Sequence, residues 1–150
     1  MTRVLFVCTG NTCRSPMAEA ILKSKEIPGV EVKSVGVFAS EGQSASTYAT
    51  EVLSDHGIQH NHSSKPLLKE DIDWATHIFT MTEGHKGAIL QLYPHAKDKI
   101  STLKEFVLDD SNNRDVIDPF GGTKDTYLET FQELKDLIDK LADKLSKHKK

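Results

Sequence analysis

Residues 4–20 read VLFVCTGNTCRSPMAEA, and this stretch joins an apolar run to the start of a helix. The run at 4–7 is short, continuous and rich in β-branched residues, which is typical of a strand buried on both faces. Pro16 suits the first turn of a helix, because its missing N–H needs no partner there. A strand that passes through a short loop into a helix predicts an α/β fold, with Cys8 and Arg14 at the junction.

The alternation of apolar runs and amphipathic segments continues along the chain. Strands are predicted at 4–7, 30–37, 77–81 and 100–103, and helices at 16–25, 44–56, 67–75, 83–93 and 123–147. This order predicts a parallel sheet flanked by helices, in a single domain over residues 1–150. Thr126 and Glu129 are predicted to form the capping box of the last helix.

Composition narrows the function classes. The chain has 150 residues, 37% of them hydrophobic and 27% charged, and its formal net charge of -3 disfavours general nucleic-acid binding. No apolar run approaches the ~18 residues of a membrane span, and no secretory signal is visible. The two cysteines, Cys8 and Cys13, cannot form a disulfide framework. We therefore expect a cytoplasmic, monomeric protein that binds neither membrane nor nucleic acid.

The loop CTGNTCRS at residues 8–15 has the character of an anion site. Backbone N–H groups that lead into a helix N-terminus bind anions, and the helix dipole adds to their effect. Gly10 lets the backbone approach a ligand, and Asn11 tolerates a left-handed conformation. Arg14 offers a planar fork of donors, and Ser15 can donate to the sulfur of Cys8. These groups favour the thiolate of Cys8, a nucleophile directed at phosphorus.

Displacement at phosphorus also needs an acid for the leaving group. The loop candidates are Asp109, Asp110, Asp115 and Asp118. The sequence VIDPFGG at 116–122 favours Asp118, because the following proline restricts it to extended conformations and stiffens the loop. Phe120 is placed to form a wall of the pocket.

At these residues the chain resembles the low-molecular-weight protein-tyrosine-phosphatase family. The resemblance lies in VCTGNTCRSPMAEA (7–20), VKSVGVFAS (32–40), NHSSKPL (61–67), IFTMTEGH (78–85) and DPFGGTKDTY (118–127). It implies a flavodoxin-like three-layer sandwich with a four-stranded parallel sheet, and neither metal nor cofactor. It also implies that Cys8 forms a phosphocysteine, that Arg14 binds the phosphoryl oxygens, and that Asp118 protonates the leaving group and then activates water.

The resemblance implies further roles around this centre. Ser34 and His62 match positions that support the loop, as do Asn11 and Ser15. The expected substrate-binding residues are Thr9, Gly10, Asn11, Thr12, Cys13, Ser15 and Phe120.

Two positions depart from the tyrosine phosphatases of the family and resemble its bacterial protein-arginine-phosphatase branch. Thr12 stands where an aliphatic residue is common, and Gly121 stands where a second aromatic residue can follow Asp-Pro. A hydroxyl at the rim suits a polar guanidino group, whereas an aliphatic side chain suits a flat apolar ring. We therefore expect phosphoarginine on proteins as the substrate, with phosphotyrosine as the alternative.

Other interpretations remain open. Cys13 is either a packed thiol or the partner of oxidised Cys8 in a reversible disulfide. His60 and His62 lack a third ligand in the sequence, so a metal site is not expected there. Arsenate reduction and non-catalytic phosphate binding are the alternative functions. A reductase that relays electrons through thiols needs further cysteines, which this chain lacks, and a loop that only binds phosphate would not need the thiol of Cys8.

Overall fold

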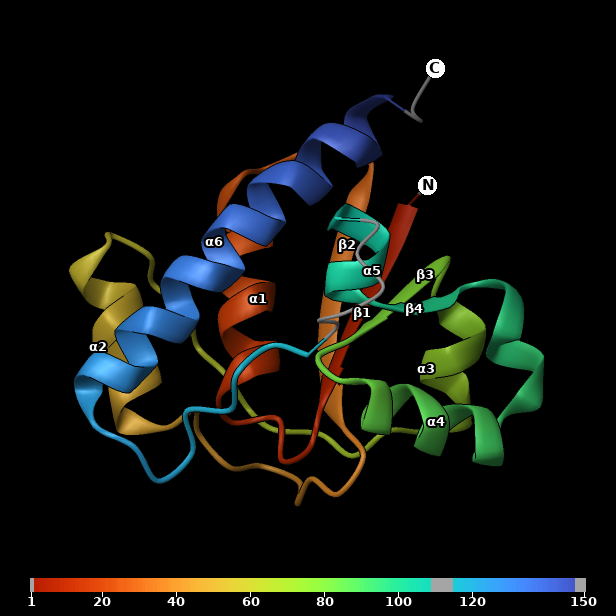
Figure 1. The fold of residues 1–150 in the computed structure, drawn as a ribbon, viewed down its shortest axis with the longest axis horizontal. Helices are drawn as coiled ribbons and strands as arrows, with labels where there is room; N and C mark the ends of the chain where they lie inside the picture. Colours follow the sequence, from red (N-terminus) through yellow and green to blue (C-terminus); the bar gives the residue numbers. More distant parts are fainter. Residues whose placement is uncertain (1, 109–114, 148–150) are drawn as a thin grey trace.

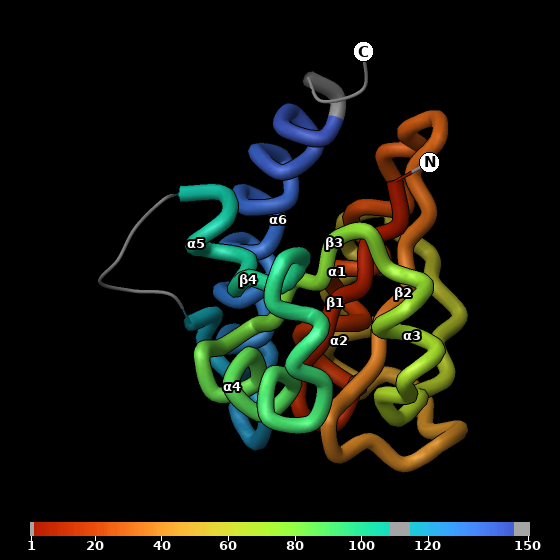
Figure 2. Tube along the Cα trace, turned by 90° about the vertical axis from the view of Figure 1, so that its right-hand side faces the viewer, coloured from red at the N-terminus to blue at the C-terminus, as the bar shows by residue number. Residues whose placement is uncertain are grey.

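The strand β1 (Thr2–Cys8) lies inside a four-stranded parallel sheet of order β2-β1-β3-β4. The computed structural model describes residues 2–108 and 115–147. The other strands are β2 (Val30–Gly36), β3 (His77–Thr80) and β4 (Ile100–Thr102). Figure 2 shows β2 and β4 on opposite sides of the central pair. The sheet confirms the predicted flavodoxin-like α/β fold.

Helices cover both faces of this sheet (Figure 1). They are α1 (Arg14–Ser24), α2 (Thr47–Asp55), α3 (Lys69–Trp74), α4 (Glu83–Leu92), the 3₁₀ helix η1 (Pro94–Asp98), α5 (Leu103–Leu108) and α6 (Lys124–Lys147). Alternate residues of β1 feed two cores, because successive strand side chains point to opposite faces. Val4 and Phe6 pack under α1 and α6, whereas Leu5 and Val7 pack on the α3 and α4 side.

The start of α6 differs from the predicted capping box. The helix begins at Lys124, so Thr126 lies inside its first turn and cannot be the cap. The backbone N–H of Thr126 donates instead to the hydroxyl of Thr123, at 3.4 Å. The prediction was wrong by one short turn, because Thr123 and Thr126 are equally suited to capping and only the preceding loop distinguishes them.

Two short helices, α5 and η1, were not predicted. For α5 a signal was present, since Thr102 and Glu105 form a capping box in which each side chain accepts from the other's backbone N–H. The signal was overlooked because Leu103, the first residue of α5, continues the apolar pattern of the strand before it, which was predicted to extend over 100–103. The predicted helix at 44–56 is shorter than expected, because Ser46 caps α2 by accepting from the N–H of Ala49.

None of the described helices is both long and apolar enough to cross a bilayer.

The buried face of α6 is expected to carry much of the fold's stability. Leu134 is fully buried, whereas Leu128 on the same helix is 38% exposed. Leu134→Ala should lower the free energy of unfolding by about 2–5 kcal/mol, because it leaves a cavity between α6 and α1. Leu128→Ala is the matched control, since it makes the same change of helix propensity, and it should cost less than about 1 kcal/mol. Urea unfolding measures both, and equal losses would contradict the packing described here.

Candidate active site

The candidate nucleophile lies where β1 ends. Cys8 is the last residue of the strand, and the loop at 9–13 leads directly into α1, which begins at Arg14. The thiol of Cys8 is buried and lies 2.9 Å from the hydroxyl of Ser15. The strand therefore fixes the sulfur at the carboxyl edge of the sheet, facing the first turn of α1, as expected for a ligand site in this fold class.

Asn11 shapes the loop between them. Its φ of 56° lies in the left-handed region, and the residue is fully buried. The side-chain amide donates to Ser15 at 2.8 Å and to Ser34 at 3.0 Å. The side-chain oxygen Oδ1 of Asn11 accepts from the backbone N–H of Lys65 at 3.0 Å. The backbone carbonyl of Asn11 accepts from Nε2 of His62 at 2.6 Å. Four hydrogen bonds thus hold a backbone conformation that asparagine tolerates better than most residues.

These contacts form a chain that ends on the sulfur. Ser34 donates to Oε1 of Glu19 at 2.6 Å and accepts from Asn11. Because Ser15 also accepts from Asn11, its own hydrogen is left to donate to Cys8. The network therefore points the O–H of Ser15 at the sulfur of Cys8.

Glu19 is the buried carboxylate behind the loop, and the sequence analysis missed it. Burial alone would raise its pKa, but contacts with His60, Lys23 and Ser34 lower the pKa to about 2. Its position one turn after Ser15 on the same helix face is the signal that could have revealed it. For His62, burial lowers the pKa below its usual value, although the bond to Asn11 opposes this effect.

Arg14 and Asp118 meet across the opening of the site. The Arg14 side chain is buried, its Nη1 donates to the carbonyl of Val116 at 3.1 Å, and its Nη2 lies 3.5 Å from Oδ2 of Asp118. The Asp118 side chain is 53% exposed, and its Oδ1 accepts from the N–H of Phe120 at 3.0 Å. The guanidinium is thus oriented by the same segment that carries the candidate acid.

The structure also separates the four candidate acids. Asp115 accepts from the N–H of Glu83 at 2.8 Å and so serves the start of α4. Asp109 and Asp110 lie outside the described residues. Asp118 lines the same cavity as Cys8 and Arg14, which agrees with the choice made from the Asp-Pro pair.

A cavity of about 250 Å³ gathers most of the expected residues. It is lined by Cys8, Thr9, Gly10, Thr12, Cys13, Arg14, Asp118 and Phe120. Phe120 is 78% exposed, so it forms an outer wall and not part of the core. Ser15, Ser34 and His62 lie behind the loop, and each contacts Asn11 within it.

Three neighbours of the loop were not anticipated from the sequence. The hydroxyl of Thr9 lies 2.9 Å from Nε2 of His85, whose pKa burial and Arg14 together lower to about 4. The thiol of Cys13 lies 3.4 Å from the hydroxyl of Tyr127 on α6.

The third neighbour is Gly36 at the end of β2. A Cβ at Gly36 would meet the carbonyl of Thr9 at 2.5 Å, so only glycine fits beside the loop. By contrast, a Cβ at Gly10 would make only an ordinary contact with the hydroxyl of Thr12, at 3.7 Å. The expected role of Gly10 is to let a ligand approach the backbone, and the protein's own atoms do not test it.

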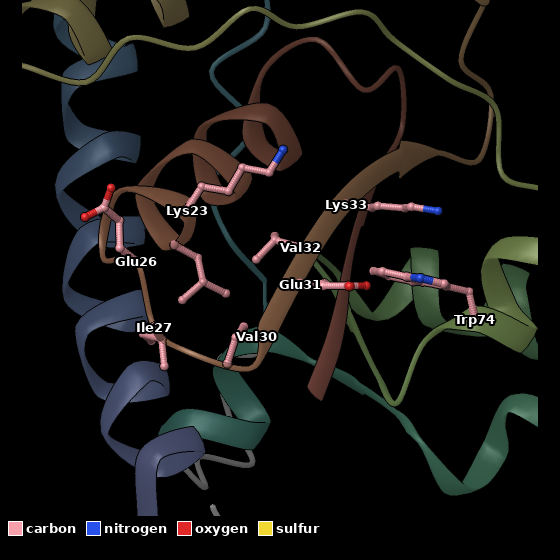
Figure 3. A pocket seen from close by; sticks show the side chains of 9 residues that line it. Lys23, Glu26, Ile27, Val30, Glu31, Val32, Lys33 and Trp74 are labelled. Atoms are coloured by element: carbon pink, nitrogen blue, oxygen red, sulfur yellow. The ribbon is translucent and has the colours of Figure 1, made fainter. Parts of the chain in front are cut away.

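A larger cavity, of about 390 Å³, lies beside the β2 edge of the sheet (Figure 3). Its lining combines apolar residues of α1 and β2 with Trp74, Lys23, Lys33, Glu26 and Glu31. None of the expected site residues lines it. Size therefore does not identify the functional cavity, whereas the grouping of a thiol, a guanidinium and a carboxylate does.

Comparison with known proteins agrees with this geometry. A protein-arginine-phosphatase of Geobacillus stearothermophilus is 57% identical over 143 residues, covering 95% of each chain. The solved structure of the YwlE arginine phosphatase from that organism has a TM-score of 0.96 at 55% identity, covering 99% of this chain and 95% of that one. The low-molecular-weight protein-tyrosine-phosphatase PtpB of Staphylococcus epidermidis is 38% identical over 139 residues, covering 93% of this chain and 96% of the relative.

A variant of the YwlE arginine phosphatase with a phosphorylated active-site serine is 44% identical to this chain. Its structure has a TM-score of 0.94 and covers 99% of this chain and 98% of that one. The family of low molecular weight phosphotyrosine protein phosphatases matches residues 3–150. The chain belongs to that family and is a phosphatase.

Proposed function

We propose that this phosphatase hydrolyses phosphoarginine on proteins through a phosphocysteine intermediate. The observation that carries the proposal is that Thr12 and Asp118 line the same cavity as Cys8, so a hydroxyl and a carboxylate are available to the leaving group of a substrate bound there. Both suit a guanidino group, which is polar, cationic and rich in donors. The relative of highest quoted identity is named for that activity.

In the first step, the thiolate of Cys8 attacks phosphorus while the P–N bond of phosphoarginine breaks. The N–H groups of the loop and the guanidinium of Arg14 hold the phosphoryl oxygens, whose charge they stabilise in the transition state. The phosphoryl group replaces Asp118 as the partner of Arg14, which frees that carboxyl to turn to the substrate. Asp118 takes up a proton from solvent once it no longer faces the guanidinium of Arg14, and it gives that proton to the leaving guanidino nitrogen.

In the second step, water attacks the phosphocysteine. Asp118, now a carboxylate, takes a proton from this water, and the S–P bond breaks to release phosphate and the Cys8 thiolate. The Ser15 hydroxyl stabilises that thiolate in both steps, because it lies 2.9 Å from the sulfur. The solved variant of a relative with a phosphorylated active-site serine supports a covalent phosphoenzyme.

Phosphotyrosine is the alternative substrate, since a relative with 38% identity is named as a tyrosine phosphatase. The exposed ring of Phe120 on the cavity wall offers a surface for either side chain. The expected cytosolic location, monomeric state and single-domain organisation stay predictions.

Initial rates on matched phosphoarginine and phosphotyrosine peptides test the mechanism. Cys8→Ala should abolish turnover on both peptides, because no nucleophile remains. Asp118→Ala should lower kcat by about 10²–10⁴-fold, because no positioned acid remains. Substantial activity of Cys8→Ala would refute the phosphocysteine intermediate.

The same peptides test the substrate. Thr12→Ile should shift the ratio of kcat/KM towards phosphotyrosine by about tenfold or more, because an aliphatic side chain replaces a polar contact. Thr50→Ile is the matched control on the exposed surface of α2, and it should leave the ratio unchanged. A wild-type preference for phosphotyrosine would reject the arginine assignment and leave the phosphatase mechanism standing.

We further propose that Cys13 protects Cys8 from irreversible oxidation. Peroxide oxidises the Cys8 thiolate to a sulfenic acid. The Cys13 thiolate attacks that sulfur and forms a disulfide, and the expelled hydroxide takes up a proton from solvent to give water. Both cysteines are buried, reduced and placed in one loop, and Cys13 lines the same cavity as Cys8.

Mass spectrometry after mild peroxide treatment tests this protection. The wild-type chain should contain a Cys8–Cys13 bridge that reductant reverses, and Cys13→Ser should accumulate the sulfinic acid of Cys8. Sulfinic acid without a bridge in the wild-type chain would show that Cys13 is only a packed thiol.

A further inference from the structure

Behind the phosphate loop, one carboxylate and two imidazoles converge from distant parts of the chain. Oε1 of Glu19 on α1 lies 3.5 Å from Nε2 of His60 and 3.8 Å from Nδ1 of His62. One ligand atom from each of the three residues lies within 4.8 Å of the other two. The fold thus supplies the third ligand that the two histidines lack in the sequence.

We propose that Glu19, His60 and His62 form a binding site for a divalent transition-metal ion, with Zn²⁺ the best match. Two histidines and one glutamate form a known three-ligand set for zinc, with a water in the fourth position. Zinc–ligand bonds of about 2.0–2.1 Å place tetrahedral ligands about 3.3 Å apart. The two contacts with Oε1 are close to that spacing, and all three ligand atoms lie within 4.8 Å of one another, so side-chain shifts that draw the ligand atoms together complete the site.

The hydrogen bonds of His62 prepare it as a ligand. Its Nε2 lies 2.6 Å from the carbonyl of Asn11, which can only accept, so Nε2 carries the hydrogen. The neutral ring then has its lone pair on Nδ1, the atom that faces Glu19. An imidazole whose second N–H donates to a backbone carbonyl is the arrangement that fixes metal-binding histidines elsewhere.

The environment of His60 also supports a metal ion at this place. Its side chain is only 10% exposed, and within the described residues its Nε2 is buried without a hydrogen bond of normal geometry. The nearest acceptor is the same Glu19 oxygen, which Ser34 already engages at 2.6 Å. The Glu19 oxygen therefore satisfies the buried Nε2 of His60 poorly. A metal ion bound between the two atoms would satisfy both of them.

Access to the three residues is provided by a cavity of about 260 Å³, which Glu19, His60 and His62 all line. The cavity is large enough for the ion and its water. It is separate in its lining from the one that holds Cys8 and Arg14. Metal bound here is therefore distinct from metal bound by the thiolates of the active site.

Lys23 is the competing cation. Its Nζ lies 2.7 Å from Oε2 of Glu19, and its side chain is 49% exposed. Figure 3 shows Lys23 extending from α1, whereas Lys33 lies over the ring of Trp74, 4.4 Å from its centre. Lys33 and Lys65 also line this cavity, but Lys23 is the lysine whose ammonium contacts Glu19, so it is the cation that a metal ion must displace.

Isothermal titration with Zn²⁺ tests the site in a Cys8→Ser, Cys13→Ser background, which removes thiolate binding. We expect one ion per chain. His60→Phe keeps a ring beside His62 but loses the ligand nitrogen, and should weaken binding by about tenfold or more. His95→Phe is the matched control, since His95 is half-exposed, pairs with Asp73, and does not line the cavity of the cluster. It should leave the affinity unchanged.

Lys23→Met provides a test that does not depend on losing a ligand. Removing the competing ammonium should tighten Zn²⁺ binding several-fold. Zn²⁺ should also raise the melting temperature of the background protein but not of its His60→Phe variant, because a ligand that binds only the folded state stabilises it.

Cobalt distinguishes the ligands in the wild-type chain. Co²⁺ held by nitrogen and oxygen in a tetrahedral site gives visible bands, whereas thiolate ligation adds a near-ultraviolet charge-transfer band. Visible bands that His60→Phe abolishes support the site. Equal Zn²⁺ affinity of the background and its His60→Phe variant, or equal weakening by His95→Phe, would overturn it.

Discussion

The left-handed backbone of Asn11 is the constraint on which the active site depends. The loop between β1 and α1 has only five residues in which the chain turns from strand to helix. A positive φ at Asn11 makes that turn, and four hydrogen bonds from three other segments hold it. The proposed anion site is therefore supported from behind, by buried polar contacts among Asn11, Ser15, Ser34 and His62, none of which lines the cavity of Cys8 and Arg14.

Much of this arrangement could be predicted from the sequence, because its elements are local. The apolar run, the loop and Pro16 place Cys8 at the end of a strand and Arg14 at the start of a helix. Asp118 could be chosen from four carboxylates by its proline, and it lines the same cavity as Cys8. These features follow from residues that are neighbours in the chain.

The remaining features depend on packing between distant segments, and no sequence pattern records such packing. The spacing of Glu19 from Ser15 places both on one face of α1, but only the fold shows that Ser34 and His60 lie against Glu19. Gly36 reads as the end of a strand until the Thr9 carbonyl lies where its Cβ would be. The cap of α6 was misplaced for a local reason, because Thr123 and Thr126 are both suitable N-cap residues.

The parallel sheet has a consequence for the order of folding. Strands that follow one another in the chain are joined by crossovers, so the contacts that build the loop close long stretches of chain. Arg14 is oriented by Val116, and Asn11 by Lys65 and Ser34, so catalytic competence requires segments from both halves of the chain. Recovery of turnover during refolding should therefore lag behind recovery of helical signal, which makes activity a reporter of the last segment to dock.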